Sequence, residues 1–81
     1  MAATDPFAEF ENPSPHYQFE TTPSGEHLLS APNDSKRSLR NFQPYAERAL
    51  AIAREHHLRI RPHLVHGSGG ESLYNLIVIF P

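Results

Sequence analysis

Hydrophobic and polar residues alternate in residues 16–31 (HYQFETTPSGEHLLSA), on both sides of a short turn segment, Thr22-Pro23-Ser24-Gly25. Pro23 has the φ angle that the first corner of a turn requires, and Gly25 can adopt the positive φ of a bulge at the third loop position. The pattern predicts a β-hairpin. Its expected pairs on one face are Thr21 with His27, Phe19 with Leu29 and Tyr17 with Ala31, and its other face carries Gln18, Glu20, Leu28 and Ser30.

The pattern changes to a helical period in residues 35–57, which are rich in helix formers. The preceding Pro32-Asn33-Asp34 closes the hairpin and offers an N-cap. Pro44 interrupts the segment, so either a short helical turn over residues 35–40 precedes a main helix that begins at Pro44, or one helix kinks there. The predicted apolar stripe consists of Tyr45, Ala46, Ala49, Leu50, Ile52, Ala53 and His56.

Alternation returns in residues 58–81, where a Gly-rich stretch at 67–70 predicts a flexible connection between two further strands. The strand from Leu73 to Phe80 is apolar on both faces except for Asn75, as is typical of a central strand. Pro62 cannot donate a ladder hydrogen bond, which favours an edge position for the strand before the loop. The expected fold class is therefore α+β: an order ββαββ, with one main helix on one face of a small antiparallel sheet.

Residues 1–15 lack any such periodicity and contain three prolines and three acids. We expect them to form a flexible acidic arm ahead of a single domain of residues 16–81. Phe7 and Phe10 could anchor this arm to the body or to another chain. The first 34 residues have a formal charge of −6 and the remaining 47 have +4, which indicates an acidic arm and a basic body.

A single helix leaves the other face of the sheet uncovered, and this open face is the candidate functional surface. Arg59, Arg61 and His63 alternate with apolar residues in the first strand of the second hairpin, so they would form a row there. Two hairpin registers are open. One places Tyr74, Leu76, Val78 and Phe80 beside this row, and the other places Leu73, Asn75, Ile77 and Ile79.

Arginine and aromatic side chains are enriched at the centres of protein interfaces. The predicted partner-binding residues are Arg59, Arg61, His63, Tyr74 and Phe80. An alternative is that the acidic arm folds over this face and neutralises it.

Other chemistries fit the sequence less well. Single-stranded nucleic acid would use Arg59 and Arg61 for phosphates and Tyr74 or Phe80 for stacking, but basic residues are few. Arg59, Arg61, His63 and Tyr74 could also form a metal-independent ribonuclease site, although no motif supports it. The only cluster with metal-ligand character is His56, His57, His63 and His66, whose spacing argues against a preformed site, and no cofactor or metal is expected.

The sequence thus predicts a small non-enzymatic regulator or inhibitor that binds a protein partner, as a monomer or weak homodimer. Its size resembles that of regulators encoded by bacteriophages, which is an analogy of class only. A single-stranded RNA- or DNA-binding module is the alternative, and a small ribonuclease the third hypothesis. The chain has no Cys, no basic-then-apolar N-terminus and no apolar run of about 18 residues. We therefore expect a cytoplasmic protein without a membrane span.

Overall fold

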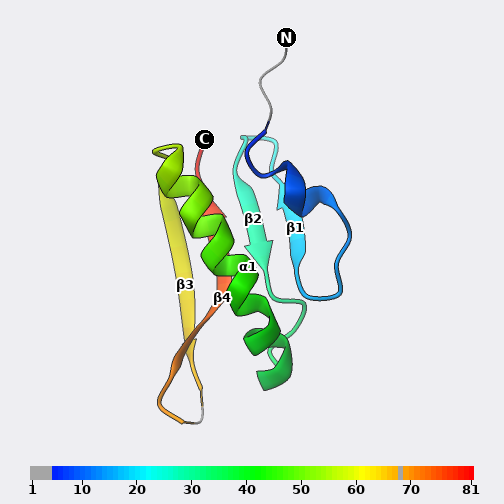
Figure 1. Cartoon of the computed structure of the whole chain (residues 1–81), viewed down its shortest axis with the longest axis vertical. Coiled ribbons are helices and arrows are strands. Elements are labelled where there is room, and N and C mark those ends of the chain that lie inside the picture. The colour runs from blue at the N-terminus through cyan, green and yellow to red at the C-terminus, as the bar shows by residue number, and fades with distance from the viewer. Residues whose placement is uncertain (1–4, 68) are drawn as a thin grey trace.

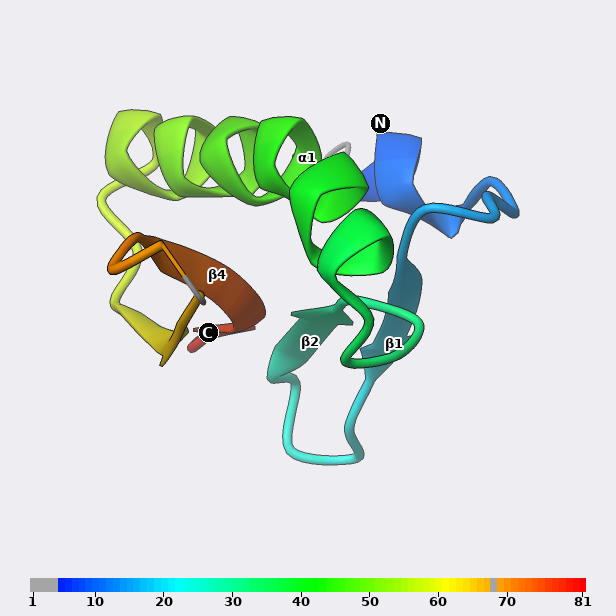
Figure 2. The same cartoon turned by 90° about the horizontal axis from the view of Figure 1, so that it is seen from below.

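A computed structural model of the chain describes residues 5–67 and 69–81. Its four strands form one antiparallel sheet in the order β1-β2-β4-β3, and one long helix, α1, lies across one face (Figures 1 and 2). This arrangement confirms the predicted α+β class and the order ββαββ.

The first hairpin has the predicted register. Strands β1 (Gln18–Thr21) and β2 (His27–Ser30) pair Phe19 with Leu29 and Thr21 with His27. Gly25 has a φ of 92°, a backbone conformation that residues with a side chain rarely adopt. Its N–H donates to the carbonyl of Thr22 at 3.0 Å. The predicted pair of Tyr17 with Ala31 lies one residue beyond the ladder.

Helix α1 (Lys36–Glu55) is continuous, with Pro44 inside it. The second of the two predicted arrangements, one helix that kinks at Pro44, is therefore the correct one. Figure 2 shows the helix bending in its first half, as expected where a proline lacks the N–H that would bond the preceding turn. The N-cap is Ser35, one residue after the predicted segment, and its hydroxyl accepts from the Ser38 N–H at 3.2 Å. Asn33 instead accepts from the Ser35 N–H, which shapes the turn before the helix.

The buried face of α1 matches most of the predicted stripe and extends it towards the helix start. Its buried residues are Leu39, Phe42, Ala46, Ala49, Leu50, Ile52 and Ala53. His56 was expected in the stripe, but it is exposed because the helix ends there and the backbone leaves helical geometry. The following His57 has a φ of 57°, which turns the chain towards the next strand.

Strands β3 (Ile60–His66) and β4 (Ser72–Ile79) form the second hairpin. As predicted, β4 is central and β3, which contains Pro62, is at an edge of the sheet. The pairing shifts at a β-bulge after His63, so that Leu64 lies opposite Tyr74 and Asn75 is passed over.

Residues 5–15 pack against the body on the helix side of the sheet, next to α1 (Figure 2). Phe7 is fully buried and Phe10 is 3% exposed, and both belong to the core together with Leu29 and Phe42. A short 3-10 helix, η1 (Ala8–Glu11), contacts β1, while α1 contacts β4 and β2. The described part of the predicted flexible arm is therefore a component of the domain, and it covers the face opposite to the one proposed from sequence.

Candidate protein-binding face

The sheet has one face that no described residue covers, because α1 and the N-terminal segment both lie on the other side (Figure 2). Leu29 and Ile77 pair with each other and are fully buried, so their neighbours in each strand point to the uncovered side. Two cross-strand rows result, Gln18–Ser30–Leu76–His63 and Glu20–Leu28–Val78–Arg61. We call this surface, with Arg59 and Phe80 at its end, the open face.

The open face changes in character from one edge to the other. Apart from Ser30, its centre on β2 and β4 is apolar, and Leu28, Leu76, Val78 and Phe80 there are half-buried. Its β3 edge carries the exposed Arg59, Arg61 and His63, and its β1 edge carries the exposed Gln18 and Glu20. An apolar centre within a charged and polar rim is the usual anatomy of a protein interface.

Four of the five predicted binding residues lie together on this face. The register is the first of the two that the sequence allowed: His63 lies opposite Leu76, Arg61 opposite Val78, and the Arg59 carbonyl accepts from the Phe80 N–H at 2.9 Å.

Tyr74 is the exception, because the bulge shifts it out of the arginine row. It lies opposite Leu64 and is half-buried against the core. Its backbone N–H donates to the Gln43 side chain at 2.9 Å, and its carbonyl accepts from the same side chain at 2.8 Å. The structure thus separates Tyr74 from the residues with which the sequence grouped it.

Residues of the first hairpin were missing from the predicted site. Leu28, Glu20 and Gln18 were assigned to one face of that hairpin, but the sequence did not show that this face continues onto β4. The pairing of β2 with β4, Leu28 with Val78, joins the two hairpins into one surface.

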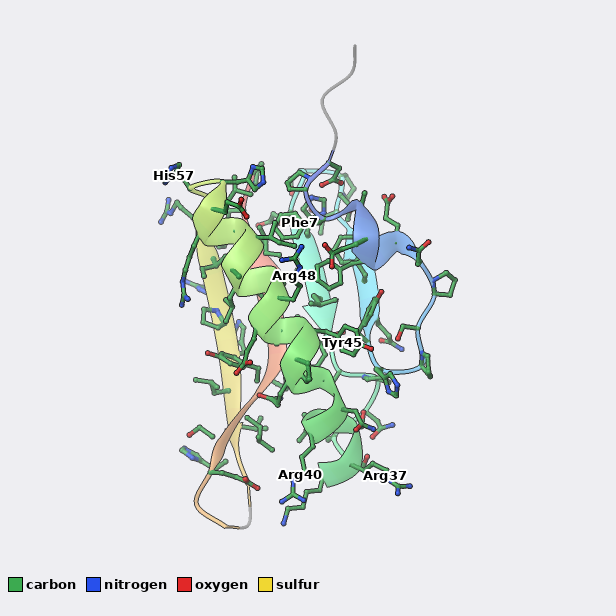
Figure 3. All side chains as sticks on the ribbon, in the orientation of Figure 1. Phe7, Arg37, Arg40, Tyr45, Arg48 and His57 are labelled. Atoms are coloured by element: carbon green, nitrogen blue, oxygen red, sulfur yellow. The ribbon has the colours of Figure 1, made fainter. Side chains whose placement is uncertain are left out.

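The charged groups of the open face make no ion pair with any residue in the described ranges, while three pairs lie elsewhere. Arg48 binds Glu9 at 3.1 Å and so fastens α1 to the N-terminal segment, and these hydrogen bonds raise the pKa of Arg48. Figure 3 shows Arg48 on the helix side, near Phe7. Arg40 lies 3.4 Å from Glu71, and His27 lies 3.9 Å from Asp5. The free charges of the open face therefore remain available to a partner.

The described residues contain no group of three side chains suited to holding a metal ion. Of the four histidines considered from sequence, His56 and His57 follow the end of α1, His63 lies on the open face and His66 ends β3. Within residues 5–67 and 69–81 there is also no helix long and apolar enough to cross a membrane.

A hollow of about 270 Å³ lies away from the open face, at the start of α1. It is lined by residues that include His16, Arg37, Ser38 and Asn41. The Ser38 hydroxyl has no hydrogen-bond partner among the described residues. Among residues 5–67 and 69–81, no second feature indicates a ligand there.

No protein-family model matches the chain, and no curated protein or solved structure is significantly similar to it.

Proposed function

We propose that this protein is a small, non-enzymatic binding protein that uses the open face to dock onto another protein. The observation that carries this proposal is the half-buried apolar centre of an uncovered sheet, formed by Leu28, Leu76, Val78 and Phe80 and bordered by unpaired charges. Contiguous apolar surface with a polar rim commonly marks an interaction site.

The chemistry of the face defines the partner. The surface of the partner needs an apolar centre, acidic groups to meet Arg59 and Arg61, and a basic or polar group to meet Glu20. Docking would then remove apolar area from water and pair each of these charges.

A nucleic acid fits this description less well. Of the residues described, only Arg59 and Arg61 bring a fixed positive charge to the face, and Glu20 on the opposite edge would repel a phosphate backbone. Tyr74, one of the two predicted stacking residues, packs against the core.

Site-specific photo-crosslinking in the native host tests the proposal. A photoreactive amino acid at Leu28, in the centre of the open face, should crosslink to protein. The same group at Ala51, an exposed position on α1, is the matched control and should give little product. Crosslinking from Leu28 should decrease when Arg61→Glu is introduced and persist with Arg37→Glu, which makes the same charge change at the start of α1 (Figure 3).

Equal crosslinking from Leu28 and Ala51 would contradict the proposal. Crosslinks from Leu28 to RNA or DNA, together with salt-sensitive retention on single-stranded DNA, would instead identify a nucleic-acid-binding module.

A further inference from the structure

The charges of the open face are arranged so that the face complements itself. Glu20 on β1 and Arg61 on β3 belong to the same cross-strand row, with Leu28 and Val78 between them. Three strand spacings separate the two edges, or about 14 Å, so that Glu20 and Arg61 of one chain do not reach each other.

Two copies can place their open faces together about a two-fold axis that runs parallel to the strands. The strand order β1-β2-β4-β3 of one copy then lies over the reversed order of the other, so β1 meets the partner's β3. In the shared row Glu20 faces the partner's Arg61, Leu28 faces the partner's Val78, and both contacts occur twice. In the neighbouring row Gln18 faces the partner's His63.

The other face-to-face arrangement has its two-fold axis perpendicular to the strands. It places β3 over the partner's β3 and β1 over the partner's β1. Arginines then meet arginines and Glu20 meets Glu20, which like-charge repulsion disfavours. Both arrangements keep the strand axes of the two sheets aligned, so charge is what selects the first orientation.

We infer that the protein bound at the open face is a second copy of this chain, in a symmetric homodimer held by reciprocal Glu20–Arg61 contacts around an apolar centre. This inference rests on the proposed function of the open face and names its partner. Because α1 lies on the far side of the sheet from the open face (Figure 2), the dimer would have four layers, with the two helices outside and the two sheets inside.

The size of the face sets the strength of the dimer. Strands β1 and β2 have four residues each, so the part of the open face that spans all four strands is only four residues long. The area that such a face can bury is small, because a standard complex buries about 800 Å² per partner. The dimer should therefore dissociate on dilution through the micromolar range.

Sedimentation equilibrium on the full chain tests this inference with charge reversals at two exposed positions. Glu20→Arg and Arg61→Glu should each weaken dimerisation about tenfold or more, because each change places like charges together at both ends of the row. The double variant Glu20→Arg/Arg61→Glu should regain wild-type affinity. An equimolar mixture of the two single variants should form a heterodimer, since each chain then supplies the charge that the other needs. Arg37→Glu should leave dimerisation unchanged.

A wild-type chain that stays monomeric up to near-millimolar concentration would overturn the homodimer, as would single variants that dimerise like the wild type or a double variant and a mixture that do not recover. Circular dichroism of every variant verifies that it is folded. Failure of the homodimer differs from failure of the proposed function. If the chain is monomeric but Leu28 still crosslinks to another protein, only the homodimer is wrong. If Leu28 and Ala51 crosslink equally, the open face is not a binding face and the proposed function is wrong as well.

Discussion

Tyr17 connects the N-terminal segment to the body through both its ring and its hydroxyl. The ring lies edge-on to Phe10 at a centroid distance of 5.5 Å and contacts the Tyr45 ring at 5.0 Å. The hydroxyl donates to the backbone carbonyl of Asn12 at 3.0 Å. Burial, and then the nearby Tyr45 and Glu9, raise the pKa of Tyr17 above its ordinary value of 10.0. The neutral phenol is therefore the form that stabilises this contact.

The free energy of unfolding should fall in alkaline solution partly through Tyr17. Because the pKa is higher in the folded state, the contribution of Tyr17 is fully present below about pH 10 and is lost as pH rises through the folded-state value. Tyr17→Phe should remove this part of the pH dependence and lower the free energy of unfolding at neutral pH by about 1 kcal/mol, for the lost hydrogen bond. Urea denaturation at several pH values measures both effects.

Tyr74→Phe is the control, because the Tyr74 hydroxyl has no hydrogen bond to a described residue. A Tyr17→Phe variant with the same alkaline loss as the wild type would show that the phenol does not contribute.

At the scale of elements, the Gln43 side chain hydrogen-bonds the backbone of β4 where β2 no longer pairs with it. The pairing of β2 with β4 ends near Asn75, whose carbonyl accepts from the Ala31 N–H at 3.0 Å. One residue further, the Gln43 amide satisfies both the N–H and the carbonyl of Tyr74. Helix α1 is thus hydrogen-bonded to the sheet as well as packed on it.

Gln43→Ala should lower the free energy of unfolding by about 2 kcal/mol, because it leaves two half-buried backbone groups of Tyr74 without partners. Amide hydrogen exchange at Tyr74 should become faster. Asn41→Ala, another amide removed from an exposed position of the same helix, should have little effect. Unchanged exchange at Tyr74 in the Gln43 variant would mean that water replaces the side chain without cost.

The elements differ in how well sequence could predict them. The register of the first hairpin was predictable because the turn residues and the alternation around it act within a few positions, as in the pairing of Thr21 with His27. The position of Tyr74 was not predictable, because it depends on a bulge in the pairing of β3 with β4 and on Gln43, which is 31 residues away along the chain. Local patterns do not encode such distant contacts.

At the scale of the whole molecule, the N-terminal segment completes the core. A helix about 10 Å wide covers only about two strands spaced by about 4.8 Å, and α1 lies over β4 and β2. The remaining apolar surface of the first hairpin, including Phe19, is covered by Phe10, whose ring centroid lies 5.9 Å from that of Phe19. Composition alone indicated a disordered arm, because prolines and acids outnumber the two aromatic residues that decide its position.

A chain that begins at Asn12 should therefore lose cooperative folding at room temperature. Replacing one buried Phe by Ala costs about 3–5 kcal/mol, and the deletion removes both Phe7 and Phe10. A domain of this size has only about 4–12 kcal/mol in total. Near-ultraviolet circular dichroism and thermal unfolding test this expectation. The control is Phe7→Leu, which keeps most of the volume and should still unfold cooperatively, whereas cooperative unfolding of the shortened chain near the wild-type temperature would contradict a core role for the segment.

The edge strand β3 limits how copies of this chain can associate. Pro62 interrupts its outward row of N–H donors, Arg61 and His63 flank the proline, and the bulge opposite changes the twist at the next residue. A further strand cannot hydrogen-bond continuously along such a border, so growth of the sheet from the β3 edge is disfavoured. Along this border, copies of the molecule are therefore hindered from joining by strand addition.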